Sequence, residues 1–268
     1  MNVLQALILG AVQGLTEFLP ISSSGHLLII EKLMGISSES GSLLTLNILL
    51  HFGTLVAVFA VYWKRIWNMI CHPIQSELKW LVVATIPAVV AALVVDFDDA
   101  FEGKFIIWSF YLTSVVLIAG TAMNKWRRRN HSLHKNVRWT DAVAMGVMQA
   151  VAILPGLSRS GSTISGGVAS GLSRKRAADF AFLMSIPAIL GSAVLDLKDV
   201  LFDGAGGSIE LLPMAVGVLA AAAFGLIAIK GFLALIRKVS MNVFAAYTFL
   251  LGTALLLNKY VFHFIELI

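Results

Sequence analysis

The alternation of apolar and polar stretches along the chain predicts a helical membrane protein. A helix needs about 20 apolar residues to cross a bilayer. Six stretches meet this requirement, near residues 43–63, 79–97, 105–124, 178–196, 211–236 and 242–262. We therefore expect an all-α polytopic membrane protein with six transmembrane helices.

Two further apolar regions, residues 3–34 and 140–172, are each divided by a polar centre. The centres read FLPISSSGH and ILPGLSRSGST. Pro20 and Pro155 cannot continue a helix, whereas the Ser and Gly residues that follow are suited to start a new one. Broken helices are tolerated at membrane depth only where they line a cavity walled by protein. We therefore predict two re-entrant helical hairpins.

The composition agrees with lipid as the surrounding solvent. The chain is 58% hydrophobic and 13% charged, whereas soluble domains carry roughly 25% charged residues. A net charge of +5 does not indicate nucleic-acid binding, because the basic residues fall between the apolar spans. The single cysteine, Cys71, excludes an internal disulfide and a CxxC metal or redox site.

The charges between the spans predict their orientation. Lys and Arg gather in the linkers at 64–79, 125–138, 173–176 and 237–238, which we expect to be cytoplasmic. Asp and Glu gather in the linkers at 96–104 and 196–210, which we expect to be external. Six spans then place both termini outside. The first hairpin enters from outside and the second enters from the cytoplasm.

This topology divides one membrane domain into two halves of opposite orientation, residues 1–124 and 140–268. A short repeat agrees with it, because Gly10-x-x-Gln13 and Gly146-x-x-Gln149 both precede a Leu-Pro break and a Ser/Gly tip. Inverted-topology repeats place their site near the membrane midplane, where broken helices meet. We therefore predict an inverted repeat with a site between the hairpin tips.

The first hairpin carries an ionisable residue within an apolar run, Glu17, with Gln13 one helical turn earlier on the same face. Such a residue is a functional candidate by default. A surface carboxylate at a shallow hairpin is the alternative for Glu17, and an amide that only packs the hairpin is the alternative for Gln13.

The tip of this hairpin contains Ser22, Ser23, Ser24, Gly25 and His26. Its second arm begins there, so free backbone N–H groups and small side chains offer an anion site. A serine hydroxyl beside a histidine and a glutamate also has the parts for nucleophilic attack with proton transfer. An ordinary Ser-capped turn and a packing histidine are the alternatives.

The second tip places Arg159 among small polar residues, Ser158, Ser160, Gly161 and Thr163. A guanidinium donates hydrogen bonds in a fork that matches phosphate oxygens. A structural ion pair with Glu17 is the alternative, and we expect Glu17 to hold Arg159 when no substrate is bound.

These two tips resemble the signature motifs of the bacterial undecaprenyl-diphosphate phosphatases, the bacitracin-resistance family. The motifs read QGLTEFLPISSSGH from Gln13 and PGLSRSGST from Pro155. The resemblance implies hydrolysis of undecaprenyl diphosphate to undecaprenyl phosphate and phosphate. That reaction recycles the lipid carrier for peptidoglycan synthesis and confers bacitracin resistance. The resemblance also implies a multi-pass protein of the bacterial inner membrane, re-entrant hairpins and a homodimer.

By this resemblance, Ser23 matches the proposed nucleophile, His26 the neighbouring acid/base and Arg159 the phosphate-binding arginine. Gln13 and Glu17 match the family's (Glu/Gln)-x-x-x-Glu element. Attack by His26 or by water instead of Ser23 remains open at this point.

The chain departs from the family pattern at two positions. Gln13 cannot ionise, so the work of a second carboxylate would fall to Glu17. Tyr247 is followed by Thr248, where the family pattern leads us to expect an arginine. A phosphate contact from the last span is therefore in question.

No dedicated set of metal ligands is visible, so Mg²⁺ or Ca²⁺ would bind together with the diphosphate. Inverted repeats with broken helices are also a transporter architecture. The alternative function is therefore a transporter or flippase of a phosphorylated lipid or small anion. Catalysis requires Ser23 and His26 and yields phosphate, whereas transport breaks no bond.

Overall fold

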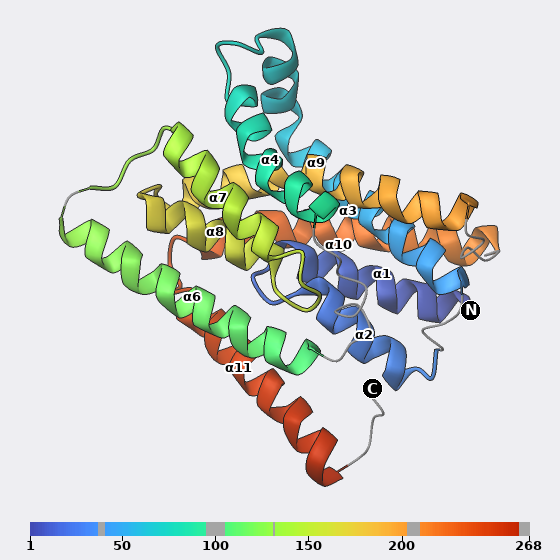
Figure 1. Ribbon diagram of the computed structural model, residues 1–268. Coiled ribbons are helices and arrows are strands. Elements are labelled where there is room, and N and C mark those ends of the chain that lie inside the picture. Colours follow the sequence, from blue (N-terminus) through green and yellow to red (C-terminus); the bar gives the residue numbers. More distant parts are fainter. Residues whose placement is uncertain (37–40, 95–104, 131, 203–209, 263–268) are drawn as a thin grey trace.

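The computed structural model describes residues 1–36, 41–94, 105–130, 132–202 and 210–262. These residues form α-helices, one short π-helix at Asn258–Phe262 and an isolated bridge between His134 and Leu172. The helices are α1 (Val3–Phe18), α2 (Ser23–Leu33), α3 (Gly41–Cys71), α4 (Leu78–Val94), α6 (Ile106–Arg129), α7 (Trp139–Val151), α8 (Arg159–Ser170), α9 (Arg174–Phe202), α10 (Leu211–Leu235) and α11 (Asn242–Leu257) (Figure 1). The all-α prediction is confirmed for this part of the chain.

Five helices are long and apolar enough to cross a membrane, namely α3, α6, α9, α10 and α11 with the π-helical turn that follows it. The sixth predicted span corresponds to α4, an apolar helix of 17 residues. Helix α9 continues to Phe202, past the predicted end at 196, because no Gly or Pro interrupts the sequence there. The acidic linker at 96–104 lies outside the described residues.

The two predicted hairpins are pairs of short helices, α1 with α2 and α7 with α8. Each pair packs on an apolar helix from the other half of the chain. Helix α1 runs along α10, and α7 runs along α4 (Figure 1). The repeated glycines make these contacts. A Cβ on Gly10 would lie 2.3 Å from the Gly217 carbonyl oxygen, and one on Gly146 would lie 2.5 Å from that of Ala84. Small residues let helix backbones approach this closely in a membrane.

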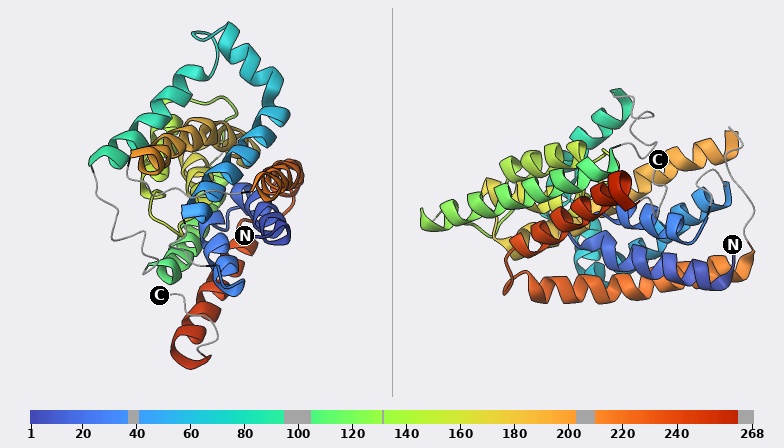
Figure 2. Two further views of the ribbon diagram at one scale, coloured as in Figure 1. Left: turned by 90° about the vertical axis from the view of Figure 1, so that its right-hand side faces the viewer. Right: turned by 90° about the horizontal axis from the view of Figure 1, so that it is seen from below.

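Helices α6 and α11 lie side by side and close the other flank of the bundle (Figure 2). The largest core cluster includes Phe18, whose ring meets Phe182 edge to face at 5.4 Å between centroids. Phe18 therefore anchors the end of α1 and fixes its neighbour Glu17. The outer helix faces carry large apolar side chains, with Leu93 74% and Leu219 68% exposed. Such faces suit contact with lipid.

Candidate active site between the hairpin tips

The two hairpin tips touch each other. The Ser160 hydroxyl donates to the Leu19 carbonyl oxygen at 2.8 Å, and the Gly156 N–H donates to the Ser24 hydroxyl at 3.3 Å. A Cβ on Gly161 would lie 3.3 Å from that of Pro20. Residues more than 130 positions apart in sequence thus form one polar centre.

Each tip starts a helix with a serine cap. The Ser22 hydroxyl accepts from the Gly25 N–H at 3.3 Å, and the Ser158 hydroxyl accepts from the Gly161 N–H at 3.0 Å. Ser22 has a φ of +72°, a left-handed conformation that non-glycine residues rarely adopt. Residues in such conformations gather at functional sites. The positive ends of α2 and α8 thus belong to two tips that touch, which suits an anion.

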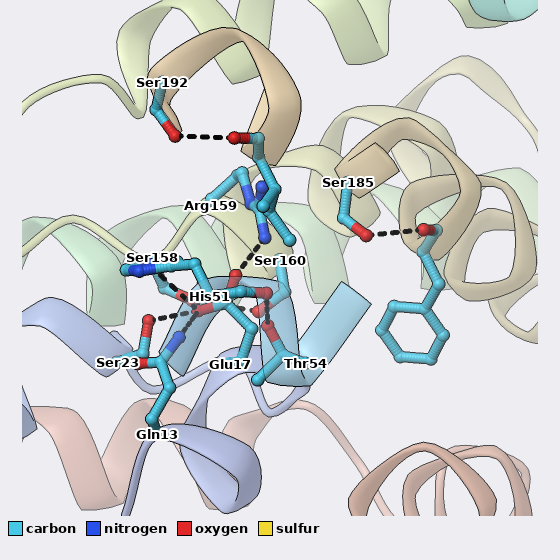
Figure 3. A network of polar contacts seen from close by, with 12 residues as sticks. Gln13, Glu17, Ser23, His51, Thr54, Ser158, Arg159, Ser160, Ser185 and Ser192 are labelled. Carbon is cyan, nitrogen blue, oxygen red and sulfur yellow. Dashed lines mark hydrogen bonds and ion pairs between the residues drawn. The ribbon is translucent and has the colours of Figure 1, made fainter. Parts of the chain in front are cut away.

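Glu17 stands at the centre of the polar network between the tips (Figure 3). Its Oε2 accepts from the Ser23 hydroxyl at 2.6 Å and from the Gln13 amide nitrogen at 3.0 Å. Its Oε1 pairs with the Arg159 guanidinium. The Glu17 side chain is 4% exposed and that of Arg159 is 23% exposed. A buried carboxylate needs such partners, and the more open guanidinium is the group that an entering anion can reach.

Glu17 has a further partner, His51 on α3, which was not predicted to belong to the site. The His51 Nδ1 donates to the Asn47 carbonyl oxygen at 2.7 Å, which leaves Nε2 free to face Glu17 Oε2 at 4.0 Å. The rule that selected Glu17 could have selected His51, because it is also an ionisable residue within an apolar span.

His26 faces away from this network. Its Nδ1 donates to the Ser22 carbonyl oxygen at 2.6 Å, and its Nε2 lies 2.7 Å from the Tyr247 hydroxyl on α11. The two rings are stacked, with centroids 5.7 Å apart. In the neutral imidazole, Nε2 is the acceptor and Tyr247 donates. Among the described residues, His26 makes no hydrogen bond with Glu17 or Ser23.

The remaining positions singled out in the sequence make local contacts within or beside the tips. Thr163 donates to the carbonyl oxygens of Arg159 and Ser160, at 2.9 and 3.2 Å. Gly25 packs so closely on Phe110 that a Cβ would lie 2.6 Å from its ring. Thr248, at the position of the expected arginine, is fully buried and donates to its own helix at Ala245.

The arrangement has the parts for phosphoryl transfer. A hydroxyl within hydrogen-bond reach of a carboxylate is a nucleophile with a general base, here Ser23 with Glu17. The Arg159 guanidinium can neutralise phosphate oxygens. Within the described part of the chain, no cluster of three or more His, Cys, Asp or Glu residues could hold a metal ion.

Comparisons with known proteins agree on one family. Residues 6–254 match the family described as Bacitracin resistance protein BacA. The chain is 42% identical over 267 residues to Undecaprenyl-diphosphatase of Carboxydothermus hydrogenoformans, covering 96% of this chain and 97% of that protein. It is 41% identical over 265 residues to Undecaprenyl-diphosphatase 4 of Bacillus thuringiensis, covering 97% and 98%. It is 33% identical over 269 residues to Undecaprenyl-diphosphatase of Halothermothrix orenii, covering 98% and 100%.

Proposed function

The chain belongs to the family of the bacitracin resistance protein BacA, and we propose that it acts as an undecaprenyl-diphosphatase. It hydrolyses undecaprenyl diphosphate to undecaprenyl phosphate and phosphate, and so returns the lipid carrier to peptidoglycan synthesis. The observation that supports a catalytic site here is the contact of Glu17 with both Ser23 and Arg159 between the tips. That contact joins a nucleophile, a base and an anion-binding group.

In the proposed mechanism, the diphosphate enters between the tips and its terminal phosphate replaces Glu17 as the partner of Arg159. Glu17 takes the proton of Ser23 as the Ser23 oxygen attacks the terminal phosphorus. The bond to the bridging oxygen breaks, and undecaprenyl phosphate leaves. Water then attacks the phosphoserine, phosphate departs, and the serine regains a proton. The hydrogen bond of 2.6 Å between Ser23 and Glu17 supports this order of roles.

His51 and His26 take different parts in this scheme. His51 Nε2 lies 4.0 Å from Glu17 Oε2. A protonated imidazole at this position favours the carboxylate form of Glu17. His26 and Tyr247 form an aromatic wall beside Ser22, where acid/base work by His26 on the substrate would require its bond to Tyr247 to open.

The proposed membrane topology has six spans, with α1–α2 and α7–α8 as re-entrant hairpins. The hairpin helices contain 16, 11, 13 and 12 residues, and each is shorter than the roughly 20 residues that a span needs. The reciprocal packing of α1 on α10 and α7 on α4 supports an inverted repeat of residues 1–124 and 140–268. We place the basic linkers in the cytoplasm, both termini outside and the protein in the inner membrane as a homodimer.

The first test is phosphate release from undecaprenyl diphosphate in detergent, with wild type compared with Glu17→Gln. We expect turnover by wild type and a loss of about 10²–10⁴-fold in the variant, because the amide cannot accept the Ser23 proton. Glu31→Gln is a matched control. Glu31 is also a buried carboxylate, and it accepts a hydrogen bond from the Asn47 side-chain nitrogen on α3, outside the tips.

Two results would contradict the proposal. The first is equal loss in the two variants at matched folding. The second is a folded wild type that releases no phosphate with or without Mg²⁺ or Ca²⁺. In the second case the transporter alternative takes its place, and flux of a phosphorylated lipid across liposomes is the next measurement.

A second prediction concerns the aromatic wall. Tyr247→Phe removes the hydroxyl that pairs with His26 but keeps the ring stack, so we expect phosphate release to fall by about tenfold or less. Loss on the scale of Glu17→Gln in the same assay would instead show that the Tyr247 hydroxyl acts on the substrate.

A further inference from the structure

A cluster of cationic residues surrounds a cavity at the end of the bundle where α6 and α10 finish and α9 begins. A cavity of about 720 Å³ opens there, and we call it the basic cavity. Its lining includes six cationic residues, Arg128, Lys135, Arg174, Lys175, Arg176 and Arg237. The ends of these helices lie on the left side of the view in Figure 1.

The charges of the basic cavity are not balanced by its own carboxylates. Asp179 is the acidic residue among its lining residues, and it lies 4.0 Å from Lys175. Arg176 pairs with Glu77. The side chains of Arg128, Lys135 and Arg237 form no ion pair with any described residue. Like charges held together in this way repel one another unless an anion enters.

The polar lining also contains an unpaired donor. The Asn124 side-chain nitrogen is buried and has no hydrogen-bond partner among the described residues, and Asn124 lines the basic cavity. The N-terminus of α9, a helix of 29 residues, begins at Arg174 in the same lining. The helix N-terminus favours an anionic ligand, and the unpaired Asn124 amide adds a polar group to the wall behind the cavity.

A smaller cavity of about 230 Å³ continues from this end between α6 and α8. It shares Asn124, Arg128 and Arg174 with the basic cavity, and its lining adds apolar side chains such as Ile164 and Met241. Its lining also adds Lys125 and Lys238, so cationic side chains continue from the basic cavity into the space between these helices, as suits a phosphate head group.

The site is distinct from the hairpin tips. Arg159 begins α8, whereas the residues after the end of α8 at Ser170 line the basic cavity. Twelve helical residues separate the two, a distance of about 18 Å.

We propose that the basic cavity binds the phosphate group of an anionic ligand, either a phospholipid head group or free inorganic phosphate. Binding removes the repulsion between Arg128, Lys135 and Arg237. This site needs no bond cleavage and does not depend on phosphatase activity.

The test measures binding to the protein purified in a neutral detergent. Phosphatidylglycerol and phosphatidylcholine are titrated with detection by native mass spectrometry, and [³²P]phosphate by equilibrium dialysis. We expect saturable binding of phosphatidylglycerol or of phosphate, and none of phosphatidylcholine. Binding of the lipid alone identifies a head-group site, and binding of phosphate alone identifies a soluble ligand.

Variants assign the binding to the cavity. Arg128→Gln and Lys135→Gln should each raise Kd by about tenfold or more, since each removes a charged donor. Arg129→Gln is the matched control, because Arg129 is exposed, adjacent in α6 and outside both linings. Ser23→Ala alters the hairpin tips but leaves the Glu17–Arg159 pair in place, so it should leave the binding unchanged. Absence of saturable anion binding, equal loss in Arg129→Gln, or loss in Ser23→Ala would overturn the proposal.

Discussion

Arg159→Ala is expected to lower kcat/KM for undecaprenyl diphosphate by about 10³–10⁵-fold, the range seen when an arginine that stabilises a phosphoryl-transfer transition state is removed. Arg159 is the cation paired with Glu17 between the tips, and its side chain is 23% exposed. It can therefore exchange the carboxylate for phosphate oxygens without leaving the site. Rates are measured as phosphate release at several substrate concentrations.

Loss of Arg159 also affects folding, because it leaves a buried carboxylate without its cation. Removing one partner of a buried ion pair costs about 3–5 kcal/mol. Arg159→Ala combined with Glu17→Gln removes both charges and should recover thermal stability without recovering activity. Arg159→Lys keeps the charge but loses the paired N–H donors with which a guanidinium binds two phosphate oxygens, so we expect intermediate activity. If Arg159→Ala retained wild-type kcat/KM, the guanidinium would be no more than a structural partner of Glu17.

The sequence was sufficient to predict the helices and the pairing of Glu17 with Arg159. Long apolar runs predict apolar helices directly, and Pro20 and Pro155 mark where the broken segments turn. An arginine and a buried glutamate at two such turns have few other charged partners, so their pairing follows from electrostatics. The repeated Gly10 and Gly146 also have a packing role that their spacing did not predict. Each permits a close contact with a helix of the other half.

The partners of the two histidines could not be predicted in the same way. The distance from His51 to Glu17 depends on how α3 packs beside α1, and the bond from His26 to Tyr247 joins residues 221 positions apart. Apolar spans present similar surfaces all round, so sequence alone does not fix which face of α3 or α11 turns inward. The expectation that His26 assists Ser23 directly rested on their nearness in sequence and on the family resemblance. In the structure His26 instead bonds Ser22 and Tyr247.

Ser23→Ala is expected to cause the largest loss, up to about 10⁶-fold in kcat, as for removal of a nucleophile that acts as a unit with its base. Ser22→Ala and Ser24→Ala are matched controls from the same tip. Ser22 caps α2 and Ser24 accepts from Gly156, whereas Ser23 is the serine that donates to Glu17. Loss of the cap costs about 1 kcal/mol of stability, so we expect both controls to stay within about tenfold of wild type.

A direct measurement separates attack by Ser23 from attack by water. Substrate labelled with ³²P in the terminal phosphate is mixed with enzyme and quenched in acid within one turnover. Attack by Ser23 leaves label on the wild-type protein and none on Ser23→Ala, because the phosphoserine forms before water enters. Unlabelled wild type together with a Ser23→Ala rate within tenfold would assign the attack to water. Glu17 would then act as the base for that water, and Ser23 would only hold the carboxylate in place.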